Sequence, residues 1–218
     1  MTRPSLRQRS HELEILDGAG VAEEVRERCY RELAMTHRWL GNHAAVIKLL
    51  RRDASTVKSV LDIGCGHGAF LCELRRKWRV EAIGFDLNPP QRSLPVRILR
   101  GDAICDRLPA ADVAVSIAVV HHLPAGEVAR LIENVGRSCR RFIILDFVRH
   151  RCPLLLFRTF VVPFVNSINA RDGVRSLERA FTPAELNRIV TESLVHTGAR
   201  FRHTVSPLYT RQIVDISY

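Results

Sequence analysis

Residues 60–70 read Val-Leu-Asp-Ile-Gly-Cys-Gly-His-Gly-Ala-Phe. An apolar run ends in the spacing Gly64-x-Gly66-x-Gly68, and helix-forming residues follow. This order predicts a buried strand, a tight turn and a helix, because glycine adopts backbone angles that other residues avoid. Glycines also let a ligand approach the main chain, and doubly wound sheets bind ligands at the carboxyl ends of their strands. We therefore expect a ligand-binding loop here, with a plain strand-to-helix connection as the structural alternative.

From residue 57 onward, strand-like runs alternate with helical segments. The expected strands are Ser59–Ile63, Ala82–Phe85, Val96–Leu99, Val113–Val120 and Phe142–Val148, and the expected intervening helices are Ala69–Trp78 and Glu127–Cys139. Strands that alternate with helices at this spacing form crossover connections, and these build a parallel sheet. The fold class predicted is therefore α/β, with a doubly wound sheet.

The end of the chain departs from this alternation. Residues 182–185 read Thr-Pro-Ala-Glu, which predicts a capped helix start and a helix that runs to about Leu194. Two last strands, Arg200–Val205 and Gln212–Ser217, are close enough for a hairpin. The predicted sheet therefore has seven strands and is mostly parallel, with an antiparallel C-terminal strand at one end.

Residues 1–56 contain helical patterns and no strand pattern. Val21, Val25, Cys29 and Leu33 fall four apart, which is one stripe of a helix. A second apolar face follows the break at Gly41-Asn42. We expect two units, an N-terminal helical extension or cap over residues 1–56 and a ligand-binding domain over residues 57–218.

Composition limits the class of protein. The chain has 218 residues, of which 46% are hydrophobic and 26% charged, and this balance excludes a mostly disordered chain. No apolar window is long enough to span a membrane, and the first residues lack the apolar core of a secretory signal. Six scattered cysteines without a C-x-x-C pair indicate reduced thiols and a cytoplasmic location, and argue against a zinc site.

The net charge of +10 comes mainly from arginine, with 30 Arg against three Lys. Such a charge raises the question of a nucleic-acid partner. Short basic clusters recur along the whole chain, however, and no long basic arm stands out. A solvated arginine-rich surface is the preferred interpretation, and nucleic acid is disfavoured as a partner.

Two acids strengthen the case for a nucleoside ligand. Asp86 ends the second strand, 22 residues after Gly64, where a carboxylate accepts both hydroxyls of a ribose. Asp102 follows the third strand, where a carboxylate can meet an adenine amino group. The glycine spacing differs from the G-x-G-x-x-G of dinucleotide-binding proteins, so NAD is disfavoured.

Together these motifs resemble those of the class I S-adenosylmethionine-dependent methyltransferases, which have a Rossmann-like fold. The resemblance covers residues 57–218 and implies that the glycine loop holds the amino-acid part of S-adenosylmethionine. It implies ribose binding by Asp86 and an adenine site beside Asp102. The cofactor-binding residues that it predicts are Asp62, Gly64, Cys65, Gly66, Gly68, Asp86, Leu87, Asp102, Ala103 and Ala118.

Three further segments resemble small bacterial methyltransferases of polyketide and alkylresorcinol-type pathways, and more distantly the quinone methyltransferases. They are residues 9–17, residues 172–186 and residues 206–209. The structural alternative is that these are generic helix starts and turns. The resemblance implies a small, largely apolar acceptor, such as a phenol, a quinone or a polyketide.

The fourth strand carries information on the acceptor. Residues 116–119 read Ser-Ile-Ala-Val and lack the Pro-Pro-aromatic signature of enzymes that methylate amino groups of nucleic-acid bases. His121 and His122 follow this strand, and either imidazole could accept a proton near neutral pH. We predict His122, and then His121, as catalytic residues, although alignment and desolvation alone can suffice. We expect no metal, because neighbouring residues at a strand end point to opposite sides.

Residues 153–165 form an unusually apolar stretch after the fifth strand. A buried helix is the preferred interpretation, and a hydrophobic substrate wall or a peripheral membrane contact is the alternative. With residues 1–56, this region is expected to cap the acceptor pocket.

The leading functional hypothesis is a methyltransferase that acts on an oxygen or carbon of a small acceptor. Methylation of RNA or a ribosomal component, and a non-catalytic cofactor-binding partner protein, are the alternatives. The sequence leaves the acceptor and the oligomeric state open.

Overall fold

The computed structural model describes residues 6–18, 20–90 and 94–218. Its seven strands form one sheet in the order β3-β2-β1-β4-β5-β7-β6. The strands are β1 (Ser59–Ile63), β2 (Glu81–Asp86), β3 (Arg97–Arg100), β4 (Ala111–Ile117), β5 (Cys139–Asp146), β6 (Arg200–Val205) and β7 (Gln212–Ser217). The first five run parallel, and β7 pairs antiparallel with both β5 and β6. The predicted fold class is confirmed, with the refinement that β7 lies inside β6, which forms the edge.

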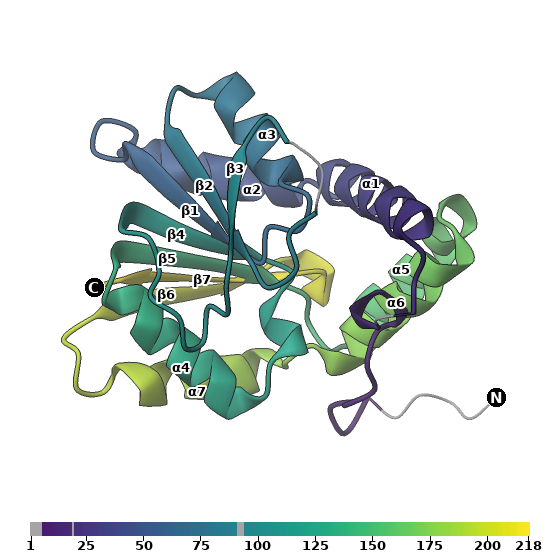
Figure 1. Cartoon of the computed structure of the whole chain (residues 1–218). Helices are drawn as coiled ribbons and strands as arrows, with labels where there is room; N and C mark the ends of the chain where they lie inside the picture. Colours follow the sequence, from purple (N-terminus) through teal and green to yellow (C-terminus); the bar gives the residue numbers. More distant parts are fainter. Residues whose placement is uncertain (1–5, 19, 91–93) are drawn as a thin grey trace.

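Helices cover both faces of this sheet (Figure 1). The helices are α1 (Glu23–Trp39), α2 (Asn42–Leu50), α3 (Ala69–Lys77), α4 (Ala125–Gly136), α5 (Arg151–Phe160), α6 (Ser167–Arg179) and α7 (Pro183–Leu194). Short 3-10 turns occupy Ile15–Asp17 (η1), Arg51–Asp53 (η2), Val120–His122 (η3), Val162–Phe164 (η4) and Pro207–Tyr209 (η5). The helix after Thr182 has the predicted bounds and the predicted capping box with Glu185.

Two apolar clusters hold the layers together. On one face, α4 and α7 bury Leu131 and Leu186 against strand residues such as Phe142. On the other face, α2 and α3 bury Leu50 and Leu74 against the sheet. Side chains of this size each contribute about 1.5–3 kcal/mol when fully buried. Both faces of the central strands are therefore covered, as the continuous apolar runs in those strands require.

A third group of helices stands beyond the carboxyl ends of the strands. Figure 1 shows α1, α5 and α6 together at one side of the sheet, with the N-terminal segment against them. Contacts join α1 to α6, α5 to α6, and η3 to α6. This group places side chains from both ends of the sequence over the edge where the glycine loop lies.

The apolar stretch at residues 153–165 is only half buried. Leu154 is enclosed, but Leu155, Phe160 and Phe164 are 67%, 56% and 81% exposed. The preferred expectation of an ordinary buried helix is therefore wrong for its outer side, because α5 has one face against α6 and one against solvent. Within the described residues, none of the helices combines the length and apolar character needed to cross a membrane.

Candidate active site

The loop between β1 and α3 has the backbone geometry that its glycines predict. Gly64, Gly66 and Gly68 have φ angles of 68°, 51° and 70°, all in the left-handed region. A Cβ at Gly64 would lie 2.6 Å from a methyl of Val119, and one at Gly66 would lie 3.0 Å from the ring of Tyr30. Both the backbone angles and the neighbouring atoms therefore disfavour a side chain at Gly64 and at Gly66.

Asp86 lies directly against the glycine loop. Its carboxylate accepts hydrogen bonds from the backbone N–H of Gly66 and of Asn88, each at 2.8 Å. The parallel pairing of β1 with β2 brings Gly64 to the end of β2, where its N–H donates to the carbonyl of Phe85. The structure thus brings together the glycine loop and the acid of the second strand, two features that are distant in the sequence.

Asp62 lies buried at the end of β1, with 3% of its surface exposed. Burial and the nearby Asp86 carboxylate raise the pKa of Asp62 well above its usual range. An ammonium group beside these acids would offset that cost, since an opposite charge favours the ionised form. Cys65 lies in the same loop, and burial raises the pKa of its thiol, which makes it a poor nucleophile.

The remaining residues predicted for an adenine site lie at the ends of β2 and β3. Leu87 follows β2 and is 60% exposed. Asp102 follows β3, and its carboxylate accepts the backbone N–H of Ile104 at 2.9 Å. The carbonyl of Ala103 accepts a hydrogen bond from the side chain of Asn134 in α4 at 2.9 Å. Asp86 and Asp102 therefore lie on neighbouring strand ends, linked by the Gly101 N–H that donates to the carbonyl of Asp86.

Tyr30 joins the glycine loop to the helical group. Its ring stacks on His67 with centroids 4.3 Å apart and planes inclined by 16°. Burial, together with the charge of Asp86 and of the N-terminal acids Asp17 and Glu14, raises the pKa of Tyr30 to about 12. Tyr30 could not be identified from the sequence, where its only signal is its place in the helix over residues 23–39.

The end of β4 is turned sharply before the histidine pair. The strand ends at Ile117 rather than Val120, and Ala118 takes a φ of 56°, which is rare for a residue with a side chain. His121 and His122 then sit in η3 with their ring centroids 4.2 Å apart. The expectation that the two imidazoles point to opposite sides is wrong, because they belong to a helical turn and not to the strand.

His121 is enclosed by two carboxylates. Its Nδ1 lies 2.7 Å from Asp146, and its Nε2 lies 3.4 Å from Glu14. Burial lowers the pKa of His121, but the charges and hydrogen bonds of Asp146 and Glu14 outweigh it and raise the pKa to about 9. The backbone N–H of His121 also donates to Asp146, so this ring is held in one orientation.

His122 is the more accessible of the pair. Its side chain is 28% exposed, against 2% for that of His121. The Nδ1 atom of His122 lies 3.1 Å from Asp17. Arg179 of α6 donates to Asp17 at 3.3 Å and to the carbonyl of His122 at 2.9 Å, which fixes both residues.

The N-terminal segment, residues 6–18, closes over this cluster. Asp172 of α6 accepts the backbone N–H groups of Ile15 and Leu16 at 2.8 and 3.0 Å. Arg9 donates to the carbonyls of His121 and Leu123 and stacks on the ring of Phe181. Some of the positive charge that was expected on the surface is therefore internal and structural. Sequence reasoning noticed the motif at residues 9–17 but not its contact with the histidines.

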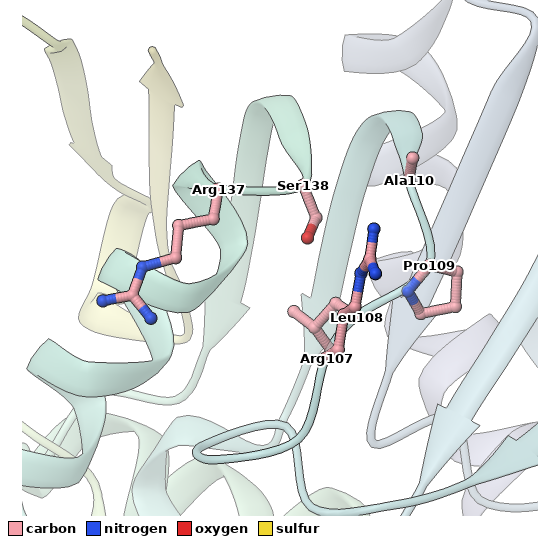
Figure 2. Close-up of a pocket in the computed structure, with 6 residues that line it drawn as sticks. All are labelled: Arg107, Leu108, Pro109, Ala110, Arg137 and Ser138. Carbon is pink, nitrogen blue, oxygen red and sulfur yellow. The ribbon is translucent and has the colours of Figure 1, made fainter.

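A hollow of about 440 Å³ lies at the opposite end of the sheet (Figure 2). Pro109 and Ala110 line it from the segment before β4, and Arg137 and Ser138 from the turn before β5. These are the amino ends of the strands, so the hollow is separate from the glycine loop and from η3. A groove of about 740 Å³ between α1 and α3 is lined by Arg28, Arg31, Arg38 and Arg76, among others.

Comparison with protein families assigns the chain. Residues 32–188 match the family described as a methyltransferase domain, and the chain belongs to that family. This membership confirms the class that the sequence motifs resemble, the class I S-adenosylmethionine-dependent methyltransferases, and with it the expectation of an enzyme. A comparison with curated proteins found no match.

Solved structures with the same fold act on different acceptors. A complex of the plantazolicin methyltransferase BpumL with a monoazolic desmethylPZN analogue and SAH superposes with a TM-score of 0.68 at 11% identity, covering 89% of this chain and 90% of that one. Human N-acetylserotonin methyltransferase with SAM superposes with a TM-score of 0.64 at 20% identity, covering 95% of this chain and 63% of that one. Magnesium protoporphyrin IX methyltransferase from Synechocystis PCC 6803 superposes with a TM-score of 0.54 at 16% identity, covering 93% of this chain and 90% of that one. At these identities the likeness establishes the fold alone.

Proposed function

We propose that this protein transfers a methyl group from S-adenosylmethionine to an oxygen or carbon of a small, largely apolar acceptor. The observation that carries the proposal is the contact between the glycine loop and Asp86, where Gly66 donates to the carboxylate. This cradle combines a main chain that carries no side chains at Gly64 and Gly66 with an acid at the second strand end. The three structural neighbours are consistent with the proposal. Each of them was solved with SAM or SAH, and their names give small-molecule or peptide acceptors.

The residues at the carboxyl edge fit the parts of this cofactor. The glycine loop, with Gly64, Gly66 and Gly68, accommodates the amino-acid part, and Asp62 offers a carboxylate to its ammonium group. We assign Asp86 to the ribose hydroxyls, because each of its carboxylate oxygens accepts one N–H group and keeps acceptor capacity for an O–H donor. Leu87, Asp102 and Ala103 flank the adenine, while Cys65 and Ala118 complete the walls. When bound, S-adenosylmethionine supplies an electrophilic methyl group.

The chain's own contribution to the transfer is alignment and exclusion of water. Methyl transfer to a nucleophilic atom gains most from holding the reactants in line in a dry site. The N-terminal segment, α1 and α6 enclose the region beyond β4 and would shield it from solvent. We assign His122 to acceptor contact because it is the exposed member of the pair. His121, held between Asp146 and Glu14, is then a positioning residue.

The division into a helical cap, residues 1–56, and a catalytic domain, residues 57–218, belongs to the same proposal. Within the cap, Tyr30 reaches the glycine loop and Glu14 reaches His121. The cytoplasmic location and the likeness to polyketide- and quinone-pathway enzymes are likewise proposed.

A second candidate, methylation of RNA, is favoured by one observation. The groove between α1 and α3 is lined by four arginines and begins beside Ala69, directly after the glycine loop. An RNA substrate would place phosphates there and would bind with a steep dependence on salt.

Incubation with methyl-labelled S-adenosylmethionine and fractionated cell extract distinguishes these candidates. The proposal predicts label in a small, organic-extractable product that survives nuclease treatment. Label confined to nuclease-sensitive material would replace it with the RNA function. Binding of S-adenosylhomocysteine without any transfer in any fraction would favour the non-catalytic partner protein.

A further inference from the structure

Three potential metal ligands converge between the N-terminal segment and η3. One ligand atom from each of Glu14, His121 and His122 lies within 4.8 Å of the others. The Oε1 atom of Glu14 is 3.4 Å from Nε2 of His121 and 3.8 Å from Nε2 of His122. A tetrahedral zinc centre, with bonds of about 2.0–2.2 Å, separates its ligand atoms by about 3.3–3.5 Å. Small side-chain shifts would therefore bring all three to bonding distance of one ion.

The far nitrogen of each imidazole is already held by a carboxylate. Nδ1 of His121 lies 2.7 Å from Asp146, and Nδ1 of His122 lies 3.1 Å from Asp17. Metal-binding histidines are oriented in this way, because a carboxylate on one nitrogen fixes the tautomer that presents a lone pair on the other. Both Nε2 atoms consequently face the same carboxylate of Glu14.

The inner imidazole provides an independent sign of a missing ligand. The Nε2 atom of His121 is buried in a residue that is only 1% exposed, and within the described part of the chain its one polar neighbour is the Glu14 carboxylate at 3.4 Å, a contact too loose for a well-formed hydrogen bond. Buried polar atoms nearly always have a partner, so such an exception calls for an explanation. A cation bound at Nε2 supplies one.

The local charge also favours a cation. Three carboxylates, from Glu14, Asp17 and Asp146, surround the two imidazoles. Arg179 offsets Asp17 at 3.3 Å, and Glu14 also accepts the hydroxyl of Ser176 at 2.7 Å. Arg9 also attracts Asp146, so Glu14 is the carboxylate that a cation at the centre would balance.

We propose that Glu14, His121 and His122 bind one divalent transition-metal ion of the zinc type, with Asp146 and Asp17 as the outer carboxylates. Two imidazoles and one carboxylate suit zinc and related first-row ions. The expectation of no metal relied on imidazoles that point to opposite sides of a strand, and η3 removes that reason.

Three protein ligands leave a coordination position open, as in catalytic zinc sites. His122 is the partly exposed ligand, so the cluster is open to solvent on its side. Resting on the proposed function, the site would bind the anionic oxygen of a phenol or enol acceptor. Such binding selects acceptors by an oxygen donor beside the transferring methyl group.

Calorimetric titration of the chelator-treated full-length protein with Zn²⁺, and separately with Mn²⁺, tests the site. We expect one Zn²⁺ per chain. His122→Ala and Glu14→Gln should each lower Zn²⁺ affinity by more than about 100-fold, and Asp17→Asn by about 10–100-fold, the range for outer-shell partners. His196→Ala, at an exposed histidine beyond α7, is the matched control and should leave affinity unchanged.

Wild-type protein that binds no Zn²⁺ overturns the proposal. Equal binding by wild type, His122→Ala and Glu14→Gln also overturns it, since the metal would then sit elsewhere, for example on the free thiols. S-adenosylhomocysteine binding measured on the same samples tests folding and the proposed function separately. Protein that binds S-adenosylhomocysteine but no Zn²⁺ contradicts only the metal site. Protein that binds Zn²⁺ but no S-adenosylhomocysteine contradicts only the proposed function. If Glu14→Gln does not fold, the Zn²⁺ affinity of His122→Ala, a change at a partly exposed residue, decides between the outcomes.

Discussion

Substituting Gly64 tests the geometry of the glycine loop. An alanine at its φ of 68° costs about 1–2 kcal/mol, because Cβ crowds the following carbonyl. The same Cβ would meet the two methyl carbons of Val119 at 2.6 and 2.9 Å, and overpacking of this kind costs about 1–3 kcal/mol. We therefore expect Gly64→Ala to lower the free energy of unfolding by about 2–5 kcal/mol.

A double-mutant cycle separates the two causes. Val119→Ala removes both crowded methyl groups and leaves only the Cβ at 3.3 Å, so it relieves the overpacking but not the backbone strain. The double variant should be more stable than the sum of the single effects predicts, by about 1–3 kcal/mol. Urea denaturation of the four proteins measures this coupling. Gly126→Ala is the control, since nothing lies within 4 Å of its added Cβ and alanine favours the helix.

Two results would refute this reasoning. A free energy of unfolding for Gly64→Ala within about 0.5 kcal/mol of wild type, the range of neutral surface changes, would mean that the loop adapts to a side chain. Strictly additive effects of the two substitutions would mean that Val119 does not limit the space at Gly64.

Three further predictions concern the N-terminal segment, an acid at the base of the sheet and the net charge. Arg9→Ala should lower the free energy of unfolding by on the order of 2–4 kcal/mol and speed hydrogen exchange over residues 6–18, because Arg9 donates three partly buried hydrogen bonds to carbonyls and stacks on Phe181. Arg7→Ala, at an exposed arginine, is the control, and equal behaviour of the two variants would contradict the stabilising role of Arg9. The backbone N–H of Lys58, with Arg140 and Ser59, lowers the pKa of Asp112 to about 2. Because this folded pKa lies below the unfolded value, the carboxylate stabilises the fold above about pH 4 and loses that effect as pH falls toward 2. After discounting for solvent screening, Asp112→Asn should lower the free energy of unfolding by about 1–2 kcal/mol at pH 6. In denaturation measured as a function of pH, this difference from wild type should shrink progressively below pH 4. A difference that does not change with pH would exclude the stabilising role of the Asp112 carboxylate. Finally, RNA should bind weakly and with a steep inverse salt dependence, measured by fluorescence anisotropy, and tight sequence-selective binding at physiological salt would promote the RNA function.

Local patterns predicted most of the sheet. The bounds of β1, β6, β7 and α7 follow the expected residues, because apolar alternation, the capping box and the turn at residues 206–211 are encoded by neighbours in the sequence. The contact between the glycine loop and Asp86 was also predictable, since parallel strands bring their carboxyl ends to one edge.

The end of β4 was not predictable from pattern. The apolar run continues to Val120, but Ala118 adopts a left-handed conformation that is uncommon for alanine and that tertiary contacts must enforce. Its N–H still donates to Leu145 of β5 at 2.8 Å, so pairing ends abruptly after this residue. The orientation of both histidines depends on this single turn.

The carboxylates around the histidines were beyond local reasoning for a different reason. Glu14 lies more than 100 residues from His121, and the segment that carries it is held by Asp172 of α6, more than 150 residues away. Contacts at such separation leave no periodic trace in one sequence. Tyr30 could not be identified from the sequence for the same reason, because its stacking on His67 joins α1 to the glycine loop, two segments that are independent in the sequence pattern.

Calorimetric titration with S-adenosylhomocysteine tests the central claim, that the glycine loop and Asp86 form the methyl donor's cradle. The account predicts binding by the wild-type protein and a loss of about 1.5–3 kcal/mol in Asp86→Ala, the scale of hydrogen bonds to a charged group, which is roughly a 10- to 150-fold weaker affinity. Absence of binding by the wild type, or equal binding by wild type and Asp86→Ala, would contradict it.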